Sequence, residues 1–143
     1  MRTRTLLLLA VACGVAILAA GVVQLIRLAG HEAPPASVAV GTAVRLGDVV
    51  VTVESVAAVD DELVVRVEIG GVDDPDGIDE FRLVVPGASV APTAPSAADR
   101  CAVVTERWQR CTIAFRVPPD AGSSRVLLYR RGDERARWDL AGA

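Results

Sequence analysis

The sequence contains few of the side chains that carry out chemistry. It has one histidine, His31, and no lysine, because all 15 basic residues are arginine. An enzyme needs a base together with a nucleophile or a metal in a cleft. His31 precedes the part of the chain that we expect to fold, no glycine-rich phosphate loop is present, and neighbouring carboxylates occur only in acidic turns. We therefore predict a protein that is not an enzyme and that holds no cofactor.

Aromatic residues are also scarce, at 3% of the chain. A hydrophobic core must therefore be built from valine, leucine, isoleucine and alanine, and there are too few rings to form a platform for stacking sugars or bases. The formal net charge of −3 does not favour polyanions, so we expect no nucleic-acid partner. The use of arginine without lysine is typical of a GC-rich genome and fits an actinobacterial source.

The longest apolar run extends from Leu6 to Ile26, with no charged residue between Arg4 and Arg27. As a helix it would span roughly 30 Å, the thickness of the hydrocarbon core of a bilayer. Arg2, Arg4 and the amino terminus make the leading segment positive, which favours its retention in the cytoplasm. The chain is thus expected to have four parts: a cytoplasmic tip at 1–5, a transmembrane helix acting as a signal anchor at 6–29, a linker at 30–40, and a domain outside the cytoplasm at 41–143.

Two other interpretations of the apolar run stay open. Small residues precede Cys13, as in a lipoprotein signal that ends at a lipid-modified cysteine, although such signals usually carry leucine where this chain has Ala10 and turn polar soon afterwards. The run also resembles a cleaved secretory signal, although its apolar core exceeds the usual length of about 7–15 residues. All three interpretations place the following domain outside the cytoplasm.

From Val38 onward, apolar and polar residues alternate in the way that is typical of half-buried β-strands. Prolines, glycines and acidic pairs separate these segments. Trp138 has the same spacing as Ala136 and Leu140, so we expect all three in the core. The predicted strands lie at 43–46, 49–56, 63–69, 81–85, 101–105, 111–117, 125–130 and 135–140. Short strands at this spacing predict an all-β protein, an immunoglobulin-like antiparallel β-sandwich preceded by one N-terminal transmembrane helix.

Four of these segments resemble a known family. They are 47–53 (GDVVVTV), 63–69 (LVVRVEI), 111–120 (CTIAFRVPPD) and 126–129 (VLLY). They are similar to the telokin-like, immunoglobulin-like domain of secreted and membrane-anchored bacterial proteins, the family of the mycobacterial immunoprotective extracellular antigen. The resemblance covers roughly Gly41 to Leu140. It implies a β-sandwich in an extracytoplasmic compartment, and it implies no catalytic residues.

Cys101 and Cys111 are predicted to form a disulfide, because disulfides persist outside the cytoplasm. If the two cysteines lie on neighbouring strands, the bridge clips a hairpin around Trp108. A structural zinc site needs four ligands, and His31 is the only histidine. The spacing also differs from the Cys-x-x-Cys motif of redox proteins. We therefore predict a structural bridge and no metal site.

The acidic segment that follows residue 72 is a weaker candidate site. An EF-hand loop has acids at alternate positions before its glycine and a glutamate six residues after it. Val72 and Leu83 occupy two of these positions, so the template is not met. A weak extracellular calcium site is the alternative to a solvated acidic turn. Its candidate ligands are Asp73, Asp74, Asp76, Asp79 and Glu80.

The charges are unevenly distributed along the chain. Ten acidic residues lie between Glu54 and Glu80, where Arg66 is the only basic residue, whereas nine arginines and five acidic residues lie from Arg100 onward. This distribution predicts an acidic end and a basic face on the folded domain. Such surfaces serve either to keep a domain soluble or to steer a charged envelope partner.

Trp108 lies between Arg107 and Arg110 in the segment that the two cysteines enclose. Tryptophan and arginine are favoured at binding hot spots, so these residues are candidate partner contacts. The alternative is that the indole covers the disulfide or an edge of the sandwich. The sequence as a whole predicts a single-pass membrane protein of the cell envelope, whose non-catalytic domain binds or scaffolds an envelope partner. The alternative is a secreted or lipid-anchored ligand-binding domain, with weak calcium binding.

Overall fold

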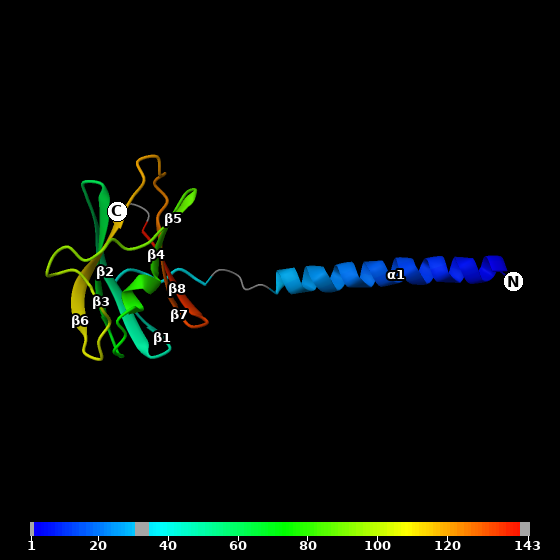
Figure 1. Ribbon diagram of the computed structural model, residues 1–143, viewed down its shortest axis with the longest axis horizontal. Helices are drawn as coiled ribbons and strands as arrows, with labels where there is room; N and C mark the ends of the chain where they lie inside the picture. Colours follow the sequence, from blue (N-terminus) through cyan, green and yellow to red (C-terminus); the bar gives the residue numbers. More distant parts are fainter. Residues whose placement is uncertain (1, 31–34, 141–143) are drawn as a thin grey trace. The chain divides into compact units, whose positions relative to one another are not determined.

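The computed structural model describes residues 2–30 and 35–140. The chain divides into two compact units, Met1–Pro34 and Pro35–Ala143, which are described separately. Figure 1 shows a single helix in the first unit and a β-sandwich in the second.

Helix α1, Arg2–Ala29, forms the first unit. Its most apolar window has a mean hydropathy of 2.8, and none of that window is buried. A helix of 28 residues is about 42 Å long at 1.5 Å per residue, which exceeds the apolar thickness of a bilayer. Helix α1 therefore fits a single-pass anchor or a signal sequence, as the apolar run predicts.

The second unit contains two four-stranded antiparallel sheets. The first sheet consists of β1 (Ala43–Leu46), β2 (Val49–Val59), β3 (Glu62–Gly70) and β6 (Gln109–Arg116), in the order β1-β2-β3-β6. The second consists of β5 (Ala88–Val90), β4 (Phe81–Val85), β7 (Val126–Arg131) and β8 (Glu134–Asp139), in the order β5-β4-β7-β8. The predicted all-β antiparallel sandwich is confirmed.

The core lies between the two sheets and is mainly aliphatic. Alternation places every second residue of a strand on the inner face. In β3, for example, Leu63, Val65 and Val67 are fully buried and face β6 in register with Phe115, Ile113 and Cys111. The predicted burial of the C-terminal strand is also confirmed, because Trp138, Ala136 and Leu140 are at most 3% exposed.

Two strands and one part of the acidic segment differ from the prediction. The described residues 101–105 form no strand. Their β-type pairing is limited to one isolated β-bridge between Val104 and Asp74. Strand β5 falls between the predicted strands at 81–85 and 101–105 and was not predicted, because a strand of three residues is too short to show alternation. The acidic segment contains a 3₁₀ helix, η1, at Gly77–Glu80.

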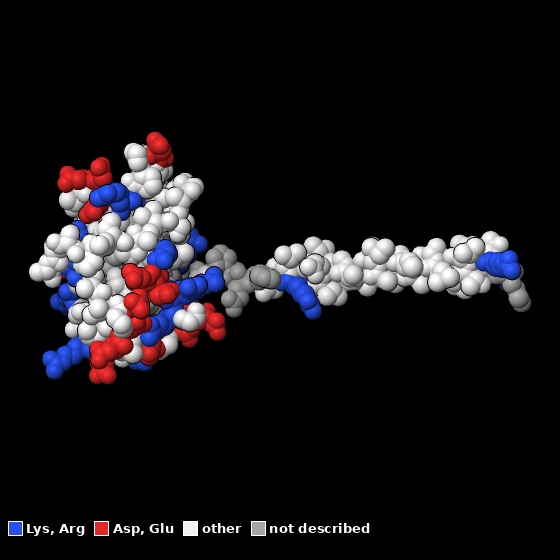
Figure 2. Space-filling view, viewed as in Figure 1, with Lys and Arg blue, Asp and Glu red and all other residues white. Residues whose placement is uncertain are grey.

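Charges that are separated in sequence are brought together in the fold. Arginines from the C-terminal part pair with acids from the acidic part: Arg100 with Glu62 at 3.3 Å, Arg110 with Glu54 at 2.9 Å, and Arg130 with Glu80 at 3.3 Å. Figure 2 shows acidic and basic side chains interleaved over the visible face of the sandwich. The predicted separation into an acidic end and a basic face therefore does not describe this face.

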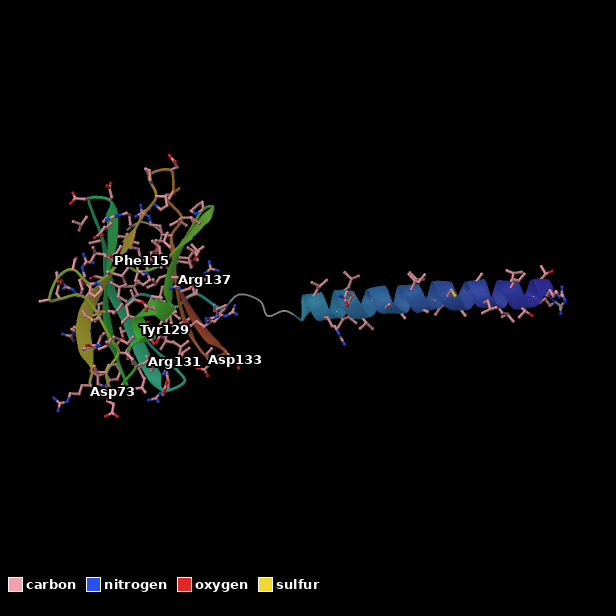
Figure 3. The ribbon with its side chains drawn as sticks, viewed as in Figure 1. Asp73, Phe115, Tyr129, Arg131, Asp133 and Arg137 are labelled. Atoms are coloured by element: carbon pink, nitrogen blue, oxygen red, sulfur yellow. A yellow bond between two sulfur atoms is a disulfide. The ribbon has the colours of Figure 1, made fainter. Side chains whose placement is uncertain are left out.

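An ion cluster centred on Arg131 joins the two sheets. Arg131, at the end of β7, donates to Asp48 in the β1–β2 turn at 2.9 Å and also to Asp74 in the acidic segment. Next to it, the backbone N–H of Gly47 donates to the carboxylate of Glu134 at 2.6 Å. These contacts fasten the β7–β8 hairpin of one sheet to the β1–β2 turn of the other; Arg131 is labelled in Figure 3.

The cluster shifts the pKa values of its carboxyl groups. Hydrogen bonds from Arg131 hold the pKa of Asp48 and that of Asp74 below the usual 3.8, and the backbone N–H of Asp76 lowers the pKa of Asp74 further. A carboxyl group with a lowered pKa in the folded state stabilises the fold at pH values above its unfolded-state pKa. That stabilisation is lost as the pH falls through the folded-state pKa.

We predict that the variant Asp48→Asn/Asp74→Asn unfolds at a lower temperature than the wild type at neutral pH, because Arg131 loses both anionic partners. The difference should shrink as the pH falls below about 4, where the wild-type carboxylates also become protonated. Thermal unfolding of the full chain in detergent micelles, followed from neutral to acidic pH, measures this. Asp133→Asn is the control, since Asp133 is exposed and has no ion pair in the described residues. Equal midpoints of the double variant and the wild type at neutral pH would contradict the prediction.

Candidate functional site

The predicted disulfide between Cys101 and Cys111 is present, with the Cα atoms 5.0 Å apart. Cys101 N–H donates to the carbonyl of Thr112 at 2.8 Å, and Thr112 N–H donates to that of Asp99 at 2.8 Å. This is a parallel bridge, so the chain enters Cys101 running in the same direction as β6. The disulfide therefore closes a loop whose two ends run in the same direction. The predicted hairpin, whose ends would run in opposite directions, is wrong. We call residues 102–110 the Trp108 loop.

The acidic segment braces the Trp108 loop. Val104 and Asp74 exchange two backbone hydrogen bonds of 2.9 Å each, and Glu106 N–H donates to the carboxylate of Asp73 at 3.1 Å. Gly71 N–H also donates to the carbonyl of Thr105 at 3.1 Å. The side chain of Val104 is only 1% exposed and inserts into the core between these contacts. The loop is thus fixed at both cysteines and along its middle.

Gly70, the last residue of β3, allows the loop backbone to pack against the sheet. A Cβ atom at this position would lie 3.0 Å from the carbonyl oxygen of Arg107 and 3.0 Å from the N and Cα atoms of Trp108. Such distances are tighter than ordinary van der Waals contact, and the atoms concerned belong to the backbone, which yields little. The absence of a side chain at Gly70 therefore sets the position of Trp108.

The Trp108 side chain lies on the surface and is 55% exposed. The other four aromatic side chains, those of Phe81, Phe115, Tyr129 and Trp138, are 0% exposed. Val103, on the same loop, is 39% exposed. The loop thus exposes two large apolar side chains, and exposed apolar surface marks interaction sites where it is contiguous.

The two arginines predicted with Trp108 have different environments. Arg107 is exposed and has no ion pair within the described residues. Arg110 is held on the outer face of the first sheet by Glu54 at 2.9 Å and Glu68 at 3.6 Å. Arg107 is therefore available to an acidic group of a partner, whereas Arg110 already shares two carboxylates.

The five candidate calcium ligands do not converge on one point. Within the described residues no group of three or more carboxylate, histidine or cysteine side chains is arranged to hold a metal ion. Asp74 pairs with Arg131, Glu80 pairs with Arg130 at 3.3 Å, and Asp73 accepts from the loop backbone. Asp76 donates its N–H to Asp74, and Asp79 accepts from Arg82 through its carbonyl. Weak calcium binding stays a prediction, and the observed contacts assign Asp73 and Asp74 to loop support.

Sequence reasoning did not identify Asp73, Asp74 and Gly70 as residues that organise the Trp108 loop. The glycine pair at the end of β3 was an available signal, since glycine in a strand often marks close approach of another backbone segment. The acids carried no such signal, because their partners lie about 30 residues further along the chain at Val104 and Glu106.

The site and the scaffold together define an immunoglobulin-like β-sandwich with one exposed aromatic on a disulfide-closed loop. The sandwich is similar to MPT63, a secreted protein of Mycobacterium tuberculosis, with a TM-score of 0.55 and 12% sequence identity over 76% of this chain and 99% of that one. It is also similar to an uncharacterized β-sandwich protein of Clostridium difficile, with a TM-score of 0.51 and 5% identity over 76% and 97% of the two chains. No family model and no curated protein matches the sequence. At these identities the similarity establishes the fold.

We predict that Cys101→Ala/Cys111→Ala lowers the free energy of unfolding by about 2.5–3 kcal/mol, the value that the chain-entropy relation assigns to a loop of this length. Urea denaturation of the full chain in detergent measures the change. Cys13→Ala is the matched control, because Cys13 lies in α1 and outside the sandwich unit. The prediction fails if the double variant unfolds at the same urea concentration as Cys13→Ala.

Proposed function

We propose that this chain is a membrane-anchored protein of the cell envelope whose extracytoplasmic sandwich binds an envelope protein, without catalysis, through the Trp108 loop. One observation carries the proposal. A chain with very few aromatic residues buries four of them completely and exposes the fifth on a loop that is held by a disulfide and by the acidic segment.

The rigidity of the loop supports a binding role. Immobilising a flexible segment on binding costs free energy, so a loop that is already ordered keeps more of the contact energy as affinity. Tryptophan and arginine supply much of the binding energy at protein interfaces when they enter a desolvated pocket. Trp108, Arg107 and Val103 would present these groups together.

The chemistry of the loop defines the partner surface that it fits. Trp108 and Val103 call for an apolar pocket, and the unpaired Arg107 calls for a carboxylate at the rim of that pocket. Arg110 contributes less, because binding would have to compete with Glu54 and Glu68. We therefore infer an acidic, apolar patch on the partner.

The location outside the cytoplasm is supported by features of both units. The length and hydropathy of α1 suit a membrane span, and the arginines at positions 2 and 4 favour a cytoplasmic amino terminus. The disulfide suits an oxidising compartment. A lipid-anchored form modified at Cys13, or a secreted form, is the alternative, and each would leave the sandwich in the same compartment.

We predict that a reporter that is active only outside the cytoplasm is active when fused after Ala143, and that the mature chain retains residues 6–26. Activity of the fusion together with the intact mass of the purified chain measures both points. A mass that begins at Cys13 with an added lipid would replace the anchor by the lipoprotein interpretation. Reporter activity confined to the cytoplasm would overturn the proposed topology.

We predict that a photo-reactive amino acid in place of Trp108 forms a discrete cross-link to one envelope protein in intact cells. Arg107→Gln should weaken this cross-link, because it removes the cation beside the indole. The control position is Val59, which is 53% exposed at the β2–β3 hairpin. A cross-linked product of equal yield and size at position 59, or none at position 108, would refute the proposed site. Trp108→Ala should change the free energy of unfolding by less than about 0.5 kcal/mol, because the ring is exposed.

A further inference from the structure

The outer face of the second sheet carries a hollow of about 360 Å³ that is separate from the Trp108 loop. Its wall consists mainly of side chains from neighbouring strands. We call it the arginine hollow, and the residues that line it include Glu80, Arg82, Ser89, Leu128, Arg130 and Arg135.

The strand register brings like charges together around this hollow. Arg130 of β7 lies directly opposite Arg135 of β8. Two residues along β7, Leu128 lies between Arg82 of β4 and Arg137 of β8, and Arg137 pairs with Asp139 at 3.0 Å. Like charges directly opposite each other destabilise a pair of strands. The pairing of Arg130 with Arg135 therefore does not stabilise the sheet.

Few acidic groups balance these arginines. Arg130 pairs with Glu80 at 3.3 Å, but the two side chains are 60% and 42% exposed, and such surface pairs are weak. Arg82 donates to the carbonyl oxygens of Phe81, at 2.7 Å, and Asp79, which orient its guanidinium without neutralising the charge. The side chain of Arg135 is exposed and has no ion pair or hydrogen bond in the described part of the chain. Three guanidinium groups thus line the hollow with one carboxylate.

The geometry points to a ligand that supplies the missing negative charge. We propose that the arginine hollow binds a phosphate-type oxyanion, of the class of phosphomonoesters and pyrophosphate. Guanidinium groups match phosphate oxygens with paired, charge-assisted hydrogen bonds. The excess of two positive charges suits a dianion better than a single carboxylate, and Ser89 adds a hydroxyl donor at the rim. A hollow of this size accommodates a small ligand, with Leu128 against its apolar part.

This proposal does not depend on the proposed role of the Trp108 loop, because it concerns the other sheet. The formal net charge of −3 makes general attraction to anions weak, so binding would depend on the local arginines. A free phosphate compound and the headgroup of an anionic lipid share the required chemistry. The experiment below distinguishes these two sources.

The test uses the full chain in nanodiscs of phosphatidylcholine, with pyrophosphate as the probe and nuclear magnetic resonance of the arginine side chains as the readout. We expect saturable shifts at Arg82, Arg130 and Arg135. Arg135→Gln should weaken the affinity roughly tenfold, as expected for loss of hydrogen bonds to a charged group. Arg135→Lys keeps the charge but loses the planar guanidinium group. Its affinity for pyrophosphate should lie between that of the wild type and that of Arg135→Gln.

Arg66→Gln is the matched control, because Arg66 is exposed on β3 of the other sheet, has no ion pair in the described residues, and its loss changes the net charge equally. Equal weakening of pyrophosphate binding by Arg66→Gln and Arg135→Gln would show a general field effect and overturn the site.

A second arm of the experiment replaces pyrophosphate by nanodiscs containing phosphatidic acid, whose headgroup is a phosphomonoester. Shifts that depend on Arg135 in this arm alone assign the ligand to a lipid headgroup, and shifts with pyrophosphate alone assign it to a free phosphate compound. Absence of such shifts in both arms overturns the proposal.

Discussion

Asp74 is the residue through which the two sheets and the Trp108 loop are joined. Its carboxylate pairs with Arg131 of the second sheet, while its backbone exchanges two hydrogen bonds with Val104. Arg131 in turn reaches Asp48 in the turn between the first two strands of the first sheet. The hydrophobic core supplies most of the stability of such a sandwich, but these polar contacts decide how the acidic segment and the loop lie against it.

The fold therefore uses its acidic segment as a support. A run of acids between two strands is usually a solvated surface, and here Asp73 and Asp74 instead accept hydrogen bonds from the loop and from Arg131. Their support, with the disulfide, keeps Trp108 in one position on the surface. This support suits the proposed binding role of the loop, because a segment that is already ordered loses less conformational entropy on binding.

The two proposed surfaces share one physical origin. Along each strand, alternate residues face the core, and the remaining ones are free to take up charge. On the first sheet Arg110 pairs with both Glu54 and Glu68, so its charge is matched. On the second sheet Arg130 and Arg135 face each other across adjacent strands, so the charge is not matched. The arginines of the C-terminal part of the chain thus have different roles according to the strand partners they receive.

The sequence by itself determined those features that depend on neighbouring residues. Three features could be predicted: the apolar run of α1, the alternation that buries Leu63 and Trp138, and the disulfide between Cys101 and Cys111. The first two follow from local sequence patterns, and the third follows from the oxidising compartment that the apolar run implies. Only the tertiary structure decided the direction in which the chain enters Cys101, the support of Val104 by Asp74, and the pairing of Arg130 with Arg135. These features depend on which distant strands become neighbours, and that choice follows from packing of the whole core, to which each local segment contributes only a part.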